Sequence, residues 1–215
     1  MEIIKTISLM MGASWASGIN LYATVLVLGL SHRFEWVTLP QTLDPLASWP
    51  VIGVAAVLYL MEFLADKIPA VDSVWDSVHT FIRPLGGAAL AFLAIGQATP
   101  QFQLIAVMIG GALALEAHAL KATTRLAINT SPEPVTNVVA SIAEDVGVVS
   151  LLALAMAYPL AAAICLTGLV IGSAWLLIKL VKILRAAFRR LFGGSKHRRM
   201  HRPPRPEDAL HPVDV

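Results

Sequence analysis

The sequence predicts an all-α fold, a polytopic membrane helical bundle with about six transmembrane helices. Of its 215 residues, 57% are hydrophobic and only 14% are charged, and the mean hydropathy is +0.71. Soluble domains carry about 25% charged residues. Several apolar runs also approach the roughly 20 helical residues that cross about 30 Å of hydrocarbon. These observations exclude a disordered chain and argue against a soluble globular enzyme.

Six apolar runs define the expected spans in chain order. The second and third runs are short, so five or seven spans are the alternatives. The first run is expected to stay in the chain rather than be cleaved as a signal peptide, because Glu2 interrupts the basic start that a signal needs. The runs cover residues 7–30, 51–64, 85–98, 102–129, 134–157 and 160–181.

Three spans per half suggest two inverted halves, residues 1–100 and 101–185, within one transmembrane domain of residues 1–185. A short echo favours this repeat, because the strings at residues 12–13 and 21–24 recur, with one difference, at residues 111–112 and 120–123. Many secondary transporters are built from inverted repeats, with the substrate site at the repeat interface. Residues 186–215 form a basic tail that is predicted to be disordered.

Basic residues predict the orientation, because Lys and Arg gather in cytoplasmic loops. Residues 1–178 contain six Lys/Arg and eleven Asp/Glu, whereas residues 179–215 contain ten Lys/Arg and three Asp/Glu. The tail is therefore expected to be cytoplasmic and to contact anionic lipid headgroups. An even number of spans then places both termini in the cytoplasm. The tail has no aromatic interleaving and no folded module, so no nucleic-acid partner is expected.

Ionisable side chains inside the apolar runs are the most informative feature, because a charge near the bilayer centre costs at least ~2.5 kcal/mol. In the fourth run, His118, Lys121 and Arg125 share one helical stripe. Asn129 extends this stripe by another turn. Glu116 lies on a different face, and its partner is expected in the first half of the chain.

Glu144 and Asp145 stand about ten residues into the fifth run. At about 1.5 Å per residue, they are level with the bases of the fourth run if the two helices are antiparallel. Opposite charges at matched depth can pair, which lowers the cost of inserting both. Two interpretations stay open: a buried ion pair that only orients two helices, and a polar site for an ion, a proton or an anionic headgroup.

A second polar group follows the second run. Glu62 and Asp66 are one helical turn apart, and residues 71–82 show helical amphipathicity. A surface helix is the expected state of residues 71–82, and a re-entrant piece is the alternative. On its polar stripe, Asp72, Asp76 and His79 have the types and spacing of a metal-binding face for a hard or borderline divalent ion. No other cofactor is expected.

The remaining features are smaller. Asn20, inside the first run, is a candidate for a buried hydrogen bond, and Gly168-x-x-x-Gly172 permits close helix packing within the bundle or in a homodimer. Cys165 is the single cysteine, so an intramolecular disulfide is impossible. The sequence contains neither a glycine loop followed by Lys-Ser/Thr nor Gly-x-Ser-x-Gly. Nucleotide hydrolysis and serine-hydrolase chemistry therefore receive no support.

Several polar strings are set in this apolar chain. They are Gly18-Ile19-Asn20-Leu21-Tyr22-Ala23-Thr24, Ala65-Asp66-Lys67-Ile68-Pro69 with Asp72, Trp75-Asp76 and His79-Thr80, Ala117-His118-x-x-Lys121-Ala122-x-Thr124-Arg125, and Asn129-x-Ser131-Pro132-Glu133-Pro134 with Glu144-Asp145 following. These strings resemble those of an uncharacterised family of bacterial integral membrane proteins that is catalogued only as a domain of unknown function. The resemblance spans about residues 8–180. It implies a multi-pass protein, expected in a bacterial inner membrane, and implies no activity.

Three functional hypotheses follow. The first is a small transporter or channel-like protein for an ion or a small polar or anionic solute. The second is a membrane-embedded, metal-dependent enzyme that acts on a lipid headgroup through Asp72, Asp76 and His79. The third is a non-catalytic membrane scaffold whose charges are structural pairs. In the first hypothesis, which we favour, the site comprises Glu62, Asp66, Glu116, His118, Lys121, Arg125, Asn129, Glu144 and Asp145.

Overall fold

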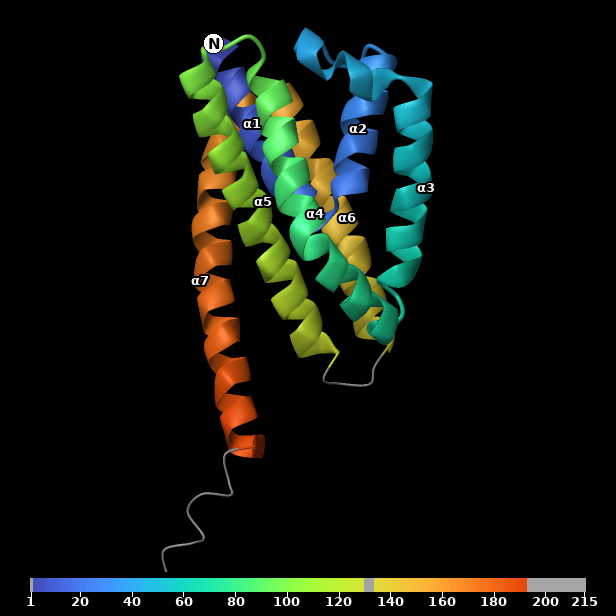
Figure 1. Cartoon of the computed structure of the whole chain (residues 1–215), viewed down its shortest axis with the longest axis vertical. Helices are drawn as coiled ribbons and strands as arrows, with labels where there is room; N and C mark the ends of the chain where they lie inside the picture. Colours follow the sequence, from blue (N-terminus) through green and yellow to red (C-terminus); the bar gives the residue numbers. More distant parts are fainter. Residues whose placement is uncertain (1, 130–133, 193–215) are drawn as a thin grey trace, which may run out of the picture. The chain divides into compact units, whose positions relative to one another are not determined.

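The computed structural model describes residues 2–129 and 134–192, and this part of the chain is all helical (Figure 1). Two compact units are distinguished, Met1–Leu180 and Val181–Val215, and the first contains every helix except the end of the last one. The elements in order are α1 (Glu2–Ile19), α2 (Leu21–Arg33), the 3-10 helix η1 (Gln41–Ala47), α3 (Trp49–Ala65), α4 (Pro69–Ile95), α5 (Pro100–Ile128), α6 (Pro134–Ala157) and α7 (Pro159–Phe192).

Proline marks where most of the long helices begin. Pro50, Pro69 and Pro100 lie in the first turns of α3, α4 and α5. The fixed φ of proline suits a first helical turn, where its missing N–H would have no helical partner. Gly96 ends α4 with φ of +65°, a conformation that glycine adopts without steric cost. The helix boundaries therefore follow local backbone chemistry.

The predicted first span, residues 7–30, is not one helix. Asn20 is extended (φ −147°, ψ 100°), and its side chain accepts a hydrogen bond from the N–H of Ala23 and so caps α2. Figure 1 shows α1 and α2 as the two arms of a V that opens toward one end of the bundle. Consistently, Leu9 of α1 and Pro40, in the segment after α2, line the same cavity. The run enters the bundle and returns, because the capped break at Asn20 reverses its direction.

The bundle has two ends, which we name by a residue at each. At the Pro100 end, α2, α4 and α6 end while α1, α3, α5 and α7 begin; at the Lys67 end, α3 and α5 end while α4 and α6 begin (Figure 1). The tip of the α1–α2 hairpin lies halfway between them, because the carbonyl oxygen of Gly18 accepts a hydrogen bond from Arg83 in the middle of α4. Arg83 is about 18 Å along the helix from Ile95 at the Pro100 end.

The prediction that residues 71–82 form a surface helix is wrong. This segment and the expected span 85–98 form one continuous helix, α4, which passes through Pro84. Its polar stripe is covered by protein, since Asp72 and Arg83 are both 0% exposed, whereas Val74 on the opposite face is 67% exposed. The amphipathicity is therefore real but inverted relative to a surface helix, with polar groups inside and apolar groups outside.

In the described part of the chain, four helices are long and apolar enough to cross a membrane, and α3 makes a fifth if it is joined to η1, which meets it at a bend of 64°. Six spans and the inverted repeat are not confirmed in the described residues.

The expectation that both termini share one side rested on an even number of spans. In the first unit, the start of α1 lies at the Pro100 end, while α7 runs from that end toward the other (Figure 1). That expectation has therefore lost its basis.

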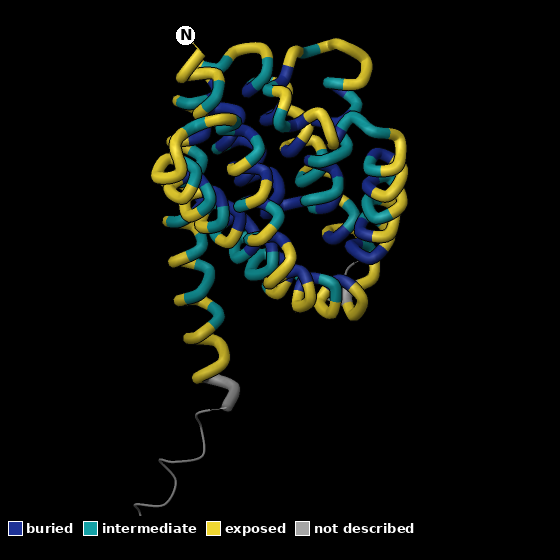
Figure 2. The backbone as a smooth tube through the Cα atoms, turned by 45° about the horizontal axis from the view of Figure 1, so that its top comes forward, coloured by how far each residue is buried: buried dark blue, intermediate teal, exposed yellow. Residues whose placement is uncertain are grey.

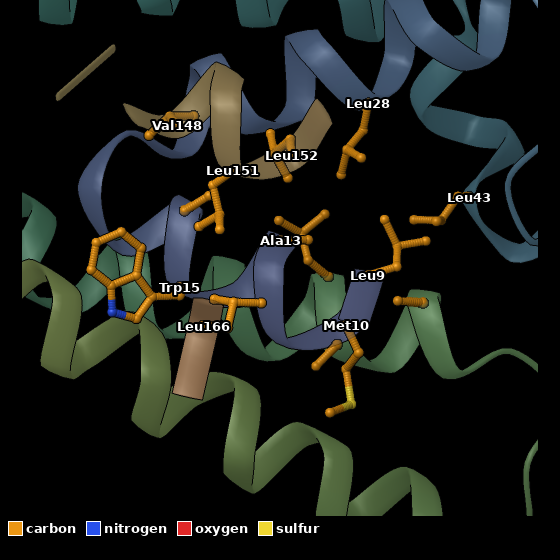
Figure 3. Packing of buried hydrophobic residues seen from close by; sticks show 14 of the residues in the cluster. Leu9, Met10, Ala13, Trp15, Leu28, Leu43, Val148, Leu151, Leu152 and Leu166 are labelled. Carbon is orange, nitrogen blue, oxygen red and sulfur yellow. The ribbon is translucent and has the colours of Figure 1, made fainter. Parts of the chain in front are cut away.

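Burial follows the pattern of a membrane protein. Figure 2 shows buried backbone in the centre of the bundle and exposed turns around it, and the exposed turns carry many large apolar side chains. In the half of the bundle near the Pro100 end, the core is apolar, with Leu9 and Ala13 of α1 beside Leu28 of α2 and Leu152 of α6 (Figure 3). Lipid tails are the natural solvent for the exposed apolar belt.

Small residues bring α1, α4 and α5 into close contact in that half. A Cβ at Gly87 of α4 would clash with Ala114 of α5, and a Cβ at Gly110 of α5 would clash with Ala91 of α4. Ser14 of α1 donates a hydrogen bond of 3.1 Å to the carbonyl of Gly87. Close backbone approach through small residues is the usual way in which helices associate in lipid.

Candidate functional site

An ionic cluster occupies the other half of the bundle, between its middle and the Lys67 end. It is assembled from four helices by spacings of one or two turns: Glu62 on α3 and Asp66 at its C-cap, Asp76 and Arg83 on α4, and Lys121 and Arg125 on α5, with Glu144 on α6. Residues three, four or seven positions apart share one helical face, so each helix presents its charges to the same interior. All seven side chains except Glu144 are at least nine-tenths buried.

Arg83 is the central base at mid-depth. Its NH2 group donates a hydrogen bond of 2.6 Å to Glu62 Oε1, and its NH1 group donates one of 2.7 Å to His118 Nδ1. NH1 also donates to the carbonyl of Gly18 at the hairpin tip (3.3 Å), and it lies 3.3 Å from Asp76 Oδ1. One guanidinium therefore joins α3, α4, α5 and the break between α1 and α2.

Lys121 lies closer to the Lys67 end than Arg83 does, and its ammonium group contacts three carboxylates. Its Nζ lies 3.0 Å from Asp66 Oδ2, 3.1 Å from Glu62 Oε1 and 3.5 Å from Glu144 Oε2. Each of these carboxylates also contacts an arginine, so no ion pair in this group is isolated. Shared contacts of this kind are what a buried charge needs to offset its desolvation cost.

Arg125 makes a forked contact with Glu144, with Nε donating to Oε1 (3.2 Å) and NH2 donating to Oε2 (2.6 Å). It also donates to Asp66 Oδ2 (3.2 Å) and to the carbonyl of Asn137 (3.1 Å). Two-point guanidinium–carboxylate contacts are the strongest ion pairs that proteins form. The predicted pairing of fourth-run bases with fifth-run acids at matched depth is thus confirmed for Glu144.

Asp145 has different partners from those expected. Its Oδ1 accepts a hydrogen bond from Asn20 Nδ2 (3.0 Å) and its Oδ2 accepts one from Tyr59 OH (3.0 Å), both neutral donors. Asn20 therefore caps α2 with its side-chain oxygen and holds Asp145 with its side-chain nitrogen. Because the start of a helix is electropositive, the first turn of α2 also favours an acid at this point.

Glu116 lies apart from the cluster, as its different helical face predicted. Its Oε2 accepts a hydrogen bond of 3.0 Å from Trp15 Nε1 of α1. The expected partner in the first half of the chain is confirmed, although it is an indole rather than a base.

The two histidines have defined hydrogen-bonding roles. His79 Nδ1 lies 2.8 Å from the carbonyl of Trp75, which can only accept, so Nδ1 carries the proton and Nε2 accepts from Tyr22 OH (2.9 Å). His118 Nδ1 accepts from Arg83, so Nε2 carries the proton and donates to Thr80 Oγ1 (3.0 Å). Both rings use both nitrogens within the protein.

This arrangement bears on the predicted metal-binding face. Across residues 2–129 and 134–192, no group of three or more His, Cys, Asp or Glu side chains is placed to hold a metal ion. His79 turns its Nε2 to Tyr22, whereas Asp72 Oδ2 accepts a hydrogen bond of 3.1 Å from Asn129 Nδ2. The geometry therefore does not bring Asp72, Asp76 and His79 together as one ligand set.

Asn129 and Asn137 close the cluster at the Lys67 end. Asn137 Nδ2 donates a hydrogen bond of 2.8 Å to Asn129 Oδ1, so an amide chain links α6, α5 and Asp72 of α4. Just outside the cluster, Lys67 donates to the carbonyl of Phe63 (2.8 Å), and its partial burial lowers its pKa below the ordinary value. This end therefore combines buried amides with a basic rim.

The cluster is acidic overall. With the neighbouring acids Asp72 and Asp145 included, the described residues of the cluster comprise six carboxylates and three bases, an excess of three negative charges if all are ionised. The carboxylates are those of Glu62, Asp66, Asp72, Asp76, Glu144 and Asp145, and the bases are Arg83, Lys121 and Arg125. Several carboxylate oxygens accept no hydrogen bond from the described residues, namely Glu62 Oε2, Asp66 Oδ1, Asp72 Oδ1 and both oxygens of Asp76. A buried, uncompensated charge is strongly unfavourable. The excess therefore requires bound protons or cations.

Two cavities adjoin the cluster. One, of about 210 Å³, is a polar cleft between the start of α4 and the end of α5, and Asp72, Asp76 and Arg125 line it. The other, of about 480 Å³, is mostly apolar and lies among α1, α5, α6 and α7, with Lys121 and Glu144 in its wall. The charged groups can thus be reached from a polar side and from an apolar side.

Sequence reasoning identified most members of this cluster and missed several neutral ones. Tyr22, Tyr59, Thr80 and Asn137 all hydrogen bond to its charged groups or histidines, yet none was singled out for a role in the site. Arg83, which forms the 2.6 Å ion pair with Glu62, was not included in the predicted site either. A single signal would have found most of them, since a polar side chain one or two turns from a buried charge on a spanning helix is a natural partner.

The fold and the cluster together define a class: a membrane-like helical protein with a hairpin of two helices, α1 and α2, and a buried, acid-rich ionic cluster. The chain belongs to the family described as Domain of unknown function (DUF4126), whose family model matches residues 7–179. No curated protein and no solved structure matches the chain. The matched residues include the whole ionic cluster, so the cluster lies in the family's domain rather than in the basic tail.

Proposed function

We propose that this chain is a small membrane transporter, or a channel-like protein, for an ion or a small polar solute, with the ionic cluster as its site. The single observation that carries the proposal is the excess of carboxylates over bases in the ionic cluster, which lies between the tip of the α1–α2 hairpin and the Lys67 end. Ionisable groups inside a membrane are costly and mark ion or substrate pathways. Broken helices are tolerated at that depth where they are covered by protein or line a cavity.

The direction of access follows from the two halves of the bundle. The half near the Pro100 end is closed by the tight contacts of Gly87 and Gly110, whereas the cleft that holds Asp72 and Asp76 lies near the Lys67 end. The proposed state is therefore one in which the site is open toward the Lys67 end alone. Transport would require the contacts among α1, α4 and α5 to loosen, since they separate the cluster from the opposite side.

We further propose that the Lys67 end is cytoplasmic, in the inner membrane of a bacterium. Lys67 and Arg125 lie at this end of the bundle, and Lys179 follows on α7, in agreement with the gathering of basic residues on the cytoplasmic side. The N-terminus would then lie on the other face, because the α1–α2 hairpin returns to the side from which it enters. The tail beyond residue 192 lies outside the described residues, and its contact with anionic headgroups stays part of this proposal.

A homodimer through α7 is the proposed assembly. A Cβ at Gly168 or at Gly172 would meet no other described atom within 4 Å, so this face of α7 has room for a partner helix. Exposed Ile164 and Ile171 provide apolar surface on the same helix. Small residues at such a seam would let two helices approach closely.

A scaffold is the second candidate function, and one observation favours it. The acids Glu62, Asp66 and Glu144 balance the three bases one for one, and their ion pairs connect α3, α4, α5 and α6. This neutral part of the cluster suffices to hold four helices together. Beyond it, Asp72 and Asp145 form no ion pair with a described base, and Asp76 has only the 3.3 Å contact with Arg83, which already pairs with Glu62 at 2.6 Å. These three carboxylates add charge without a base of their own, which supports transport over a purely structural role.

Flux measurements on the full chain in proteoliposomes separate the two candidates. We expect Glu144→Gln combined with Asp145→Asn to abolish ion flux, followed with voltage-sensitive and pH-sensitive dyes, while the protein stays folded and monodisperse in detergent. Asp44→Asn is the matched control, because this exposed acid pairs with His32 at the Pro100 end, far from the cluster. Unchanged flux in the folded double variant contradicts the transporter, and a double variant that no longer folds supports the scaffold.

A further inference from the structure

The polar cleft near the Lys67 end contains two carboxylates that the bases of the cluster do not fully compensate. Asp72 and Asp76 are one turn apart on α4, and both line the cleft together with Ser77, Thr80 and Arg125. Its volume, about 210 Å³, is far above the roughly 10–15 Å³ that one water requires. A small ion and several water molecules fit into this space.

Both carboxylates are buried and incompletely satisfied. Asp72 is 0% exposed and Asp76 is 5% exposed, yet Asp72 Oδ1 and Asp76 Oδ2 accept no hydrogen bond within the described part of the chain. The other oxygen of Asp72 accepts from the neutral amide of Asn129, and the other oxygen of Asp76 lies 3.3 Å from Arg83. Arg83 is already committed to Glu62 at 2.6 Å, so it compensates Asp76 only in part.

We infer that this cleft binds a monovalent metal cation, Na⁺ or K⁺, between the free carboxylate oxygens of Asp72 and Asp76, with the hydroxyl oxygen of Ser77 and water completing its coordination. The inference rests on the proposed transport function, because it names the ion that the site would carry or couple to. A cation here would also relieve the repulsion between two like charges one turn apart.

The ligand chemistry selects the class of cation. The side chains that line the cleft offer a metal ion only carboxylate and hydroxyl oxygens as ligands. Oxygen ligands suit hard cations rather than zinc or copper. Arg125 also lines the cleft, and its positive charge opposes a divalent ion about twice as strongly as a monovalent one. With only two carboxylates and a base beside them, the site has too little negative charge to favour Mg²⁺ or Ca²⁺, which are bound through several oxygen ligands.

The test is a binding measurement on the full chain in detergent, made without reference to flux. The melting temperature is followed in NaCl, KCl and choline chloride at equal ionic strength, and the affinity is measured by isothermal titration. We expect Na⁺ or K⁺ to raise the melting temperature saturably, and choline, which is too large for the coordination site, to have no such effect. A rise of the same size in choline overturns the inference, and so does tighter binding of Mg²⁺ than of either monovalent ion.

Variants then locate the site. Asp76→Asn is expected to weaken cation binding at least tenfold, while Asp44→Asn, which removes an exposed acid at the other end, leaves it unchanged. Asp72→Asn provides the same test if Asp76→Asn does not fold, and affinity unchanged in the folded variant overturns the assignment. Cation binding without flux would retain this site and refute transport, whereas flux without cation binding would retain transport and refute this site.

Discussion

The excess of acids over bases makes a sharp prediction about stability. Replacing a base in the cluster should destabilise the protein far more than replacing an acid, although both kinds of side chain are buried. The informative pair is Arg83→Met and Asp76→Asn, because the two residues lie 3.3 Å apart and are 0% and 5% exposed. Position and burial are therefore matched, and charge is the main difference.

The magnitudes follow from the contacts. Arg83→Met leaves Glu62 without its 2.6 Å partner, removes the donors to His118 and Gly18, and raises the formal excess of negative charge from three to four. Removing one partner of a buried ion pair lowers the free energy of unfolding by about 3–5 kcal/mol. Asp76→Asn lowers the excess to two and loses only the 3.3 Å contact, so we expect a change within about 1 kcal/mol of zero, or a net stabilisation.

The assay is reversible unfolding of the full chain in mixed micelles, with the free energy of unfolding compared among variants at one pH and without added Na⁺ or K⁺. The double variant Arg83→Met with Glu62→Gln should recover part of the loss, with a coupling energy of about 0.5–3 kcal/mol. Equal destabilisation by the acid and base variants would refute the charge-excess argument. A tolerated Arg83→Met would refute it as well.

Three further predictions concern the packing, the hairpin and the topology. Gly87→Ala should lower the free energy of unfolding by about 1–3 kcal/mol because its Cβ would clash with α5, whereas Gly53→Ala, with open space around it, should stabilise the protein by up to about 1 kcal/mol in the same unfolding assay. Asn20→Ala should cost about 0.5–2 kcal/mol for the lost cap, and more in total because it also removes a donor from a buried carboxylate; equal stability would argue against the hairpin tip. On a cysteine-free background, cysteines placed at Glu35 and Lys67 should react with a membrane-impermeant thiol reagent from opposite sides of the membrane, and labelling from the same side would refute the topology.

The ionic cluster was largely predictable from the sequence because burying charge is expensive. Once Lys121 and Arg125 are assigned to a spanning helix, acids at the same depth are required, and Glu144 meets that requirement. The same reasoning drew attention to Glu62 and Asp66, whose helix contacts the same two bases. Which acid pairs with which base was not predictable, since depth along a helix does not determine the distance between helices.

The α1–α2 hairpin was not predictable from hydropathy. Residues 7–30 are long and apolar enough to read as one span, and a single Asn changes the mean hydropathy little. The signal that was available is the position of Asn20, because Asn is among the best N-cap residues and here caps a second helix inside an apolar run. A buried cap at mid-depth needs partners of its own, and Asp145 is the partner that the structure reveals.

The prediction of a surface helix at residues 71–82 was wrong for a related reason. Periodicity shows that one face of a helix is polar, but it does not show whether water or protein covers that face. The covering groups come from other parts of the chain, since Arg83 contacts Glu62 of α3 and Asp72 accepts a hydrogen bond from Asn129. The periodicity of one segment does not contain these contacts.

The carboxylates that have no base of their own are the residues at which stability and function make opposite demands. A bundle that needed only to be held together would be better served by three acids and three bases, because each further buried carboxylate adds desolvation cost and repulsion. Asp72 and Asp76 increase that cost beside a cleft, with oxygens that no described group satisfies. Stability given up at one place, where a small ion can restore it, is the pattern of a binding site. The cost of these two residues is therefore the strongest physical reason to place function, rather than architecture, at the Lys67 end of the bundle.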